Sequence, residues 1–216
     1  MLYADDLCFS YKNTGSSVID HLSFRVEPGE ALVFVGPNGT GKSTVLSLLA
    51  GIRKPASGTV RADGRIGYVP QGTGLFEDMT VEENLGFFAR LAGSDIPDAF
   101  LNGLQPHMKK KVRQLSGGLA KRVSIACALA GSPETILFDE PCTGLDIISR
   151  EWLQEIVLDL KKNGRSVIYA CHEASEFEPF YDWLIFMGRK PYRKYSRDEM
   201  GDLSRTYLEL FRGRHF

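Results

Sequence analysis

The sequence predicts an α/β fold: a mostly parallel sheet with helices packed on its faces, an antiparallel strand region at the N-terminus, and a helical subdomain. Three observations predict it. Short apolar runs of strand length dominate the first third of the chain, and helical spacing dominates the stretch from Thr80 to about Ala130. After residue 131, strand-like and helix-like segments alternate, which is typical of parallel strands joined by crossover helices.

The N-terminal elements are expected to be strands. Apolar-rich stretches at Leu2–Tyr11 and His21–Val26 precede the fully apolar run Ala31–Val35. This run leads into a glycine-rich loop. A helix is expected to start at Ser43 and to stop at Gly51, because glycine readily adopts the left-handed conformation that ends helices. Strand, glycine loop and helix therefore follow one another directly.

The middle of the chain is expected to be helical. A short strand at Ile66–Val69 ends just before Gln71, and Thr80 then forms a capping box with Glu83 at the start of a helix. A second helix is expected to begin near Ser116 and to stop at the glycine at 131. We therefore divide the single domain 1–216 into a core of residues 1–71 and 131–216 and a helical subdomain of residues 72–130.

The C-terminal third alternates between strands and helices. A capping box at Ser196 and Glu199 is expected to open a last helix that runs to about Phe211. Before it, the pattern predicts a strand at Thr135–Phe138, a helix at Ile147–Lys162, a strand at Ser166–Ala170, a helix at Ala174–Tyr181 and a strand at Trp183–Met187.

Composition limits the classes of function. The 216 residues are 43% hydrophobic and 25% charged, and 26 basic residues nearly balance 27 acidic ones. No basic excess therefore favours nucleic acid or acidic lipid as a partner.

The four cysteines form no C-x-x-C pair, which is the pattern of reduced thiols in a cytosolic protein; a regulatory disulfide between Cys142 and Cys171 is the alternative. No signal peptide is legible and no apolar run approaches the roughly 18 residues of a spanning helix, so a membrane role would come through another chain.

The glycine-rich loop is the first motif that carries chemistry. Residues 36–43 read G-P-N-G-T-G-K-S and match the phosphate-loop pattern G-x-x-x-x-G-K-[ST]. Its glycines allow successive backbone N–H groups to face phosphates, Lys42 supplies positive charge, and the Ser43 hydroxyl is suited to bind Mg²⁺. The expected core is therefore that of a P-loop NTPase.

Two carboxylates and a second helix start add to this motif. Asp139 and Glu140 end an apolar strand, where buried charge is costly unless a ligand uses it. We expect Asp139 to hold the Mg²⁺ shell and Glu140 to act as general base; an ordinary turn before Pro141 is the alternative. The segment Leu115–Gly118 begins a helix with small residues, and such a start can bind an anion.

Taken together, these motifs resemble the nucleotide-binding domain of ATP-binding-cassette transporters over nearly the whole chain. The motifs occur in the family's order: Tyr11, the phosphate loop, Gln71, Leu115–Gly118, Asp139 with Glu140, Thr143–Asp146, and His172. Two positions depart from the family pattern. Leu119 replaces a frequent glutamine and Cys142 replaces a usual threonine or serine, and neither change removes a group expected to contact phosphate.

The resemblance implies roles for the remaining motif residues. Tyr11 would stack on adenine, Gln71 would contact Mg²⁺ or the attacking water, and His172 would contact the γ-phosphate. Asp146 would reach a partner subunit. From the residues alone, Tyr11 can also be a packing tyrosine, His172 a structural histidine, and Asp146 the N-cap of the helix that follows it.

Motifs and resemblance together define the expected site. Catalysis is assigned to Lys42, Gln71, Glu140 and His172. Contacts with ATP are assigned to Tyr11, Gly36, Pro37, Asn38, Gly39, Thr40, Gly41, Lys42, Ser43, Thr44, Ser116, Gly117, Gly118 and Asp146. Binding of Mg²⁺ is assigned to Ser43, Gln71 and Asp139. The resemblance also implies a head-to-tail pair of such domains, identical or different. In this pair each ATP lies between one subunit's phosphate loop and the other subunit's Leu115–Gly118, the signature segment.

The expected function is ATP hydrolysis that powers a membrane transporter on a separate chain, with this subunit cytoplasmic and peripheral at the inner face of the membrane. The stretch Met79–Leu91 resembles bacterial subunits that drive exporters. A soluble cassette ATPase acting on nucleic acid or ribosomes is the alternative, but the short stretch between Lys42 and Leu115 leaves no room for the insertions of that class. A nucleotide sensor without chemistry is disfavoured by the intact Lys42, Asp139, Glu140 and His172, and no nucleic-acid partner is expected.

One surface is a candidate for docking the membrane partner, and it consists of Phe76, Phe87, Phe88 and Leu91. The alternative, which the sequence favours, is that at least half of this set forms the core of the helical subdomain. The transported substrate is not encoded in this chain, since its contacts would lie in the membrane subunit.

Overall fold

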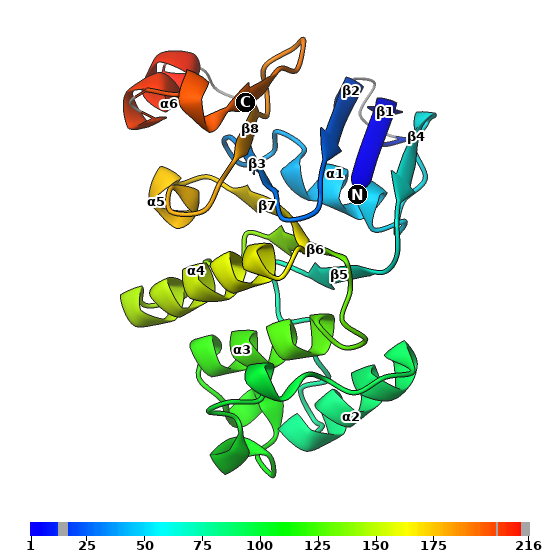
Figure 1. The fold of residues 1–216 in the computed structure, drawn as a ribbon, viewed down its shortest axis with the longest axis vertical. Helices are drawn as coiled ribbons and strands as arrows, with labels where there is room; N and C mark the ends of the chain where they lie inside the picture. Colours follow the sequence, from blue (N-terminus) through cyan, green and yellow to red (C-terminus); the bar gives the residue numbers. More distant parts are fainter. Residues whose placement is uncertain (13–16, 202, 213–216) are drawn as a thin grey trace.

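The computed structural model describes residues 1–12, 17–201 and 203–212, and it contains two sheets (Figure 1). The larger sheet has six strands in the order β5-β6-β7-β3-β8-β9, and the smaller sheet has three in the order β2-β1-β4. The larger sheet comprises β3 (Ala31–Val35), β5 (Ile66–Val69), β6 (Thr135–Asp139), β7 (Ser166–Cys171), β8 (Trp183–Phe186) and β9 (Lys194–Ser196). All its pairings are parallel except that of β8 with β9. The predicted fold class is confirmed.

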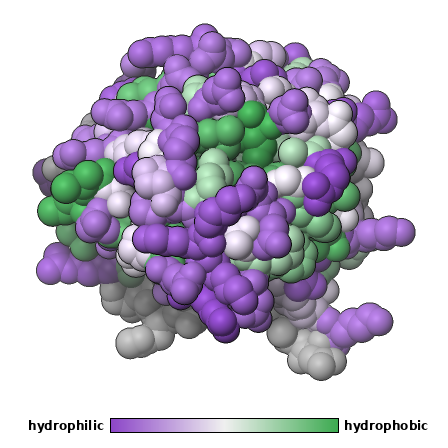
Figure 2. All heavy atoms as spheres, turned by 90° about the horizontal axis from the view of Figure 1, so that it is seen from below, coloured by the Kyte–Doolittle hydropathy of each residue, from purple (hydrophilic) through white to green (hydrophobic). Residues whose placement is uncertain are grey.

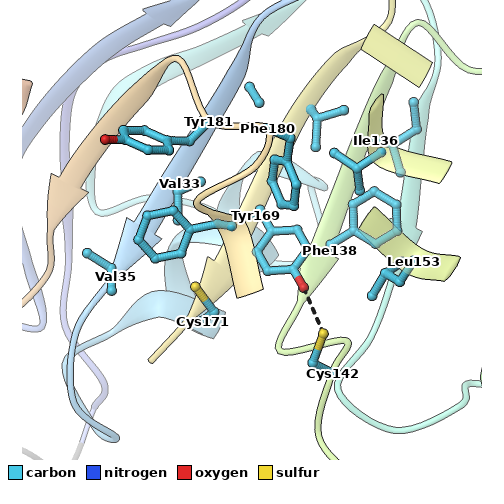
Figure 3. Close-up of a cluster of buried hydrophobic side chains, with 14 of the residues drawn as sticks. Val33, Val35, Ile136, Phe138, Cys142, Leu153, Tyr169, Cys171, Phe180 and Tyr181 are labelled. Atoms are coloured by element: carbon cyan, nitrogen blue, oxygen red, sulfur yellow. Dashed lines mark hydrogen bonds between the residues drawn. The ribbon is translucent and has the colours of Figure 1, made fainter. Parts of the chain in front are cut away.

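The central strands are buried on both faces. Every residue of β3, β6 and β7 is buried, and along each strand the side chains alternate between two apolar clusters. Val33, Phe138 and Tyr169 belong to the cluster that Figure 3 shows, which packs against helix α4 (Ile147–Lys162). The other cluster lies between the sheet, helix α1 (Lys42–Leu49) and the small sheet. This double cover explains why these strands read as continuous apolar runs.

The small antiparallel sheet contains one strand that the sequence did not predict. β1 (Leu2–Phe9) pairs with β2 (Ile19–Val26) as expected, and β4 (Ser57–Ala62) pairs with the other edge of β1. No residue of β4 is buried, so its side chains lack the apolar alternation that marks a half-buried strand. Its backbone pairing with β1 creates the strand.

The helical subdomain has its own small core. It contains helices α2 (Val81–Ala92) and α3 (Gly117–Ala128) with short 3₁₀ turns between them, and the buried side chains of Val81, Leu104 and Val123 meet there. The Thr80–Glu83 capping box is present, as predicted. The division of the chain at residues 71/72 and 130/131 stays a prediction.

Two predicted helices differ from the structure. Helix α5 (Ala174–Phe177) ends four residues before the predicted end at Tyr181, because Pro179 has no N–H to donate to the carbonyl oxygen of Ser175. Gln154 Nε2 donates to that carbonyl oxygen instead, at 2.9 Å. At the C-terminus the Ser196 capping box starts only a 3₁₀ turn. The chain is extended at Met200, and a separate helix α6 follows at Leu203–Phe211; residue 202 lies outside the described residues.

The four cysteines are all free thiols, so the structure contains no Cys142–Cys171 disulfide. The Cys142 sulfur lies 3.2 Å from the Tyr169 hydroxyl instead (Figure 3). Within the described part of the chain, no helix is both long and apolar enough to span a bilayer.

Candidate nucleotide-binding site

The phosphate loop connects β3 to α1, and its conformation depends on glycine. Gly39 and Gly41 have φ angles of 81° and 96°, in the region where residues with side chains are strained. A Cβ at Gly36 would lie 2.7 Å from the Met187 carbonyl oxygen. Gly41 occupies the N-cap position of α1 without a side-chain cap, so the helix N-terminus is open to an anion. Asn38 and Gly39 at the tip are exposed.

Lys42 is folded back into the loop. Its side chain is 3% exposed, and Nζ donates hydrogen bonds to the carbonyl oxygens of Gly36 at 2.8 Å and Pro37 at 3.0 Å. The same amine lies 3.2 Å from Glu140 Oε1. Thr40 Oγ1 also donates to the Pro37 carbonyl oxygen, at 2.8 Å. The Lys42 amine therefore lies beside the carboxylate of Glu140, the residue that the sequence predicts to be the general base.

Ser43 and Asp139 meet across the loop and the sheet. Ser43 Oγ donates to Asp139 Oδ1 at 2.8 Å, and the Tyr68 hydroxyl donates to Asp139 Oδ2 at 3.0 Å. Burial raises the pKa of the Asp139 carboxyl, and the two hydrogen bonds oppose that rise. Hydroxyl and carboxylate oxygens are the ligands that Mg²⁺ prefers, so this pair is suited to hold the ion.

Glu140 is the centre of the arrangement. Its backbone φ is 44°, a conformation that costs a non-glycine residue of the order of 1–3 kcal/mol and that clusters at functional sites. Gln71 Nε2 donates to Glu140 Oε2 at 3.3 Å. His172 Nδ1 lies 3.8 Å from the same oxygen and, within the described residues, has no hydrogen-bond partner. All four predicted catalytic residues are thus close together.

Strand topology explains this convergence. Gly36, Gln71, Glu140 and His172 each follow closely on the carboxyl end of one of the parallel strands β3, β5, β6 and β7. The carboxyl ends of parallel strands lie at the same edge of a sheet, which is where ligands bind in such folds. Residues that are up to 136 positions apart in the numbering (Gly36 and His172) therefore share one site.

Tyr11 lies at the mouth of the loop. Its hydroxyl is 3.0 Å from Thr44 Oγ1, and its ring packs edge-on against Phe9 at 5.0 Å between centroids. The Arg53 guanidinium lies 5.0 Å from the same ring. Tyr11 lines a cavity of about 370 Å³ whose other lining residues are Val18, Gly39, Gly41, Lys42, Ser43, Thr44 and Glu140.

The signature segment lies in a different cavity. Ser116 is the N-cap of α3 and its hydroxyl accepts a hydrogen bond from the Leu119 N–H at 3.3 Å. Ser116, Gly117 and Gly118 line a cavity of about 520 Å³ together with Asp146, and none of its lining residues lines the phosphate-loop cavity. The Asp146 carboxylate accepts a hydrogen bond from the Ser149 N–H at 2.8 Å, so it caps α4 as its local pattern predicts. A single chain does not bring its signature segment to its own phosphate loop.

Two residues at the site were missed by sequence reasoning. Tyr68 holds Asp139, and its only signal was an aromatic residue with a polar tip on the strand before Gln71. Lys121 in α3 is 4% exposed and contacts the segment around Gln71, and its only signal was a lysine among apolar residues of a helix. Burial lowers the pKa of Lys121 to about 8, so the amine is still mostly protonated at pH 7.

The fold and this site define a P-loop ATP-binding domain. Residues 19–143 match the family model described as ABC transporter. The chain is 35% identical over 203 residues to a taurine import ATP-binding protein from Jannaschia sp., covering 86% of this chain and 76% of that protein. It is 36% identical to a Nod factor export ATP-binding protein from Paraburkholderia xenovorans, covering 75% of this chain and 60% of the relative. A solved ATP-binding subunit of an ABC transporter superposes with a TM-score of 0.83 at 25% identity, covering 98% of this chain and 99% of that one.

The chain therefore belongs to the ABC transporter family, as an ATP-binding subunit. Subunits of this family are ATPases coupled to transport and work with transmembrane partners. The two relatives named above differ in the direction of transport, one being an import protein and the other an export protein.

Proposed function

We propose that this chain hydrolyses ATP in a composite site formed with a second ATP-binding subunit, and that closing and opening of the pair drives a membrane transporter. The observation that carries the proposal is the separation of the two half-sites. Lys42, Ser43 and Glu140 line one cavity, whereas Ser116–Gly118 line another in the same chain. A head-to-tail pair would place each signature segment, at the N-terminus of α3, over the partner's phosphate loop.

In this mechanism the phosphate-loop amides and Lys42 bind the triphosphate, which requires the Lys42 amine to leave the carbonyl oxygens of Gly36 and Pro37. Ser43 and Asp139, with Gln71, would hold Mg²⁺, which when bound neutralises phosphate charge. Ser43 Oγ and Asp139 Oδ1 lie 2.8 Å apart, a spacing that two ligands of one ion can have.

Glu140 then accepts the proton of the attacking water. The hydrogen bond from Gln71 Nε2 orients the Glu140 carboxylate for this step. His172, whose Nδ1 is buried without a hydrogen-bond partner among the described residues, would donate a hydrogen bond to the γ-phosphate. Tyr11 would stack on the adenine at the cavity mouth, and Asp146 would contact the partner subunit from the end of α4 that it caps.

The membrane partner would dock on the helical subdomain. Phe76, Phe87 and Leu91 are 46%, 36% and 73% exposed, and the Phe76 and Phe87 rings pack edge-on at 5.0 Å. Phe88 instead packs against the subdomain core. On the face that Figure 2 shows, at the helical-subdomain end, apolar patches interrupt a hydrophilic surface. We propose the transmembrane subunit as the occupant, which would place this chain peripherally at the inner face of the membrane. The direction that we propose is export, because the stretch 79–91 resembles bacterial export subunits.

A mixing experiment tests the composite site. Ser116→Arg blocks the signature half of the site and Glu140→Gln removes the base, and each variant alone should be inactive while still binding ATP. In a head-to-tail pair of one of each, the Glu140 of the first variant faces the intact signature of the second. Mixing the two should therefore restore ATPase activity, and a mixture that is no more active than its separate components contradicts the composite site.

A further inference from the structure

A buried lysine connects the signature helix to the segment that carries Gln71. Lys121 lies on α3, five residues after Ser116, and its Nζ donates hydrogen bonds to three backbone carbonyl oxygens in a row. These belong to Pro70 at 3.0 Å, Gln71 at 3.0 Å and Gly72 at 2.9 Å. The three residues follow β5 directly, where the chain passes from the core sheet into the helical subdomain.

The chemistry of this contact is specific for an ammonium group. A protonated lysine has three N–H donors and no acceptor, and here each donor is matched by one carbonyl oxygen. Hydrogen bonds from a charged donor are stronger than neutral ones. A backbone carbonyl oxygen lies in the peptide plane, so it can turn away from the amine only if the backbone moves. Movement of α3 therefore displaces the backbone of residues 70–72.

The link continues to the catalytic carboxylate. The Gln71 side chain donates from Nε2 to Glu140 Oε2 at 3.3 Å, while its own carbonyl oxygen is held by Lys121. Ser116 at the start of α3 belongs to the cavity that would serve the partner's ATP. A continuous chain of contacts thus joins this subunit's signature segment to its own Glu140.

We propose that Lys121 is a positioning residue that couples the two ATP sites of the dimer, by transmitting the position of α3 to Gln71 and Glu140. Docking of the signature segment on the partner's ATP then sets Gln71 and Glu140 in the subunit's own site. This inference rests on the composite site proposed above. Removing the amine should uncouple the two sites without removing any group that contacts ATP.

The test compares Lys121→Met with Lys110→Met in the full chain. Lys110 is an exposed lysine of the same subdomain, so it controls for the loss of a charge. For Lys121→Met we expect an ATP dissociation constant within about twofold of wild type, a kcat lower by about tenfold, and a Hill coefficient for ATP that falls to about 1 from a higher wild-type value. Lys121→Arg, which keeps a buried cation with several donors, should recover part of both kcat and cooperativity.

Several results would overturn the inference. They are wild-type kcat and cooperativity in Lys121→Met, a wild-type Hill coefficient of about 1, or a parallel fall of ATP binding, kcat and thermal stability that indicates a purely structural role. The mixing experiment separates the two proposals. In the mixed pair, the one intact site uses the Glu140 of the Ser116→Arg subunit, whose own signature is blocked, so coupling through Lys121 predicts that activity is restored only to about a tenth of that of one wild-type site. Restored activity together with a Lys121→Met variant that behaves like Lys110→Met overturns only the coupling role of Lys121. A mixture that is no more active than its separate components overturns the composite site.

Discussion

Replacing Glu140 by glutamine is the sharpest test of the catalytic arrangement. The side chain is 10% exposed, and its carboxylate oxygens lie 3.2 Å from Lys42 Nζ and 3.3 Å from Gln71 Nε2. Glutamine has the same size, so Glu140→Gln keeps the packing and the shape of the cavity. It removes the negative charge and the ability to accept a proton from water.

The magnitude follows from that single loss. A positioned general base typically accelerates a reaction by a factor of about 10²–10⁴, so kcat should fall at least about a hundredfold, which corresponds to about 2.7 kcal/mol of activation free energy. ATP binding should survive or tighten, because the Lys42 amine loses its ion-pair partner and is available to phosphate.

The assay is steady-state phosphate release at saturating ATP and Mg²⁺, together with equilibrium binding of a fluorescent ATP analogue. Glu178→Gln is the matched control, since Glu178 is exposed on the same half of the molecule and lies outside both cavities. Hydrolysis by Glu140→Gln at the rate of this control refutes Glu140 as the base. A lowered kcat with an equal loss of ATP affinity would refute the reasoning about Lys42.

Three further predictions concern neighbouring groups. Tyr68→Phe keeps the ring but removes the hydrogen bond to Asp139, so more Mg²⁺ should be needed for half-maximal ATPase activity, by several-fold for a bond worth about 1 kcal/mol; an unchanged Mg²⁺ titration would count against the role of Tyr68. Gly118→Ala places a Cβ 2.8 Å from Ser149 Oγ, so the melting temperature should fall by about 2–4 °C per kcal/mol of strain, and an unchanged melting curve would show that Ser149 moves freely. Iodoacetamide at pH 8 should label only Cys8 in the native protein, because burial raises the pKa of the other three thiols, to about 12 for two of them; mass spectrometry should find four labels after unfolding, and fast native labelling of a second cysteine would contradict their burial.

The helix starts show how far local pattern extends. Thr80, Ser116 and Asp146 each cap the helix that their sequence predicts, because a capping side chain reaches a backbone N–H only two or three residues away. At Ser196 the same reasoning predicted a helix that runs to about Phe211. The capping box forms there, but Met200 is extended and the helix does not continue. A cap specifies where a helix can start, whereas its length depends on what the following residues pack against.

The sequence named residues that the structure brings close together, but it did not predict the contacts between them. The phosphate loop, Gln71, Glu140 and His172 were found from motifs, and the parallel order of the strands explains why they meet. The ion pair between Lys42 and Glu140, the Tyr68–Asp139 hydrogen bond and the contacts of Lys121 had no signal of comparable strength, since each joins residues about 50–100 positions apart.

The sequence by itself determined the fold class, the strand–loop–helix unit of the phosphate loop and the candidate ATP-binding residues of that loop, because these depend on apolar periodicity, glycine conformations and motifs that act over a few residues. Only the tertiary structure decided that β4 is a strand, that the signature segment lies in a cavity apart from the phosphate loop, and that Lys121 holds the backbone around Gln71. These features depend on backbone pairing and side-chain contacts between distant segments, and such contacts exist only once the sheet and the helical subdomain have packed.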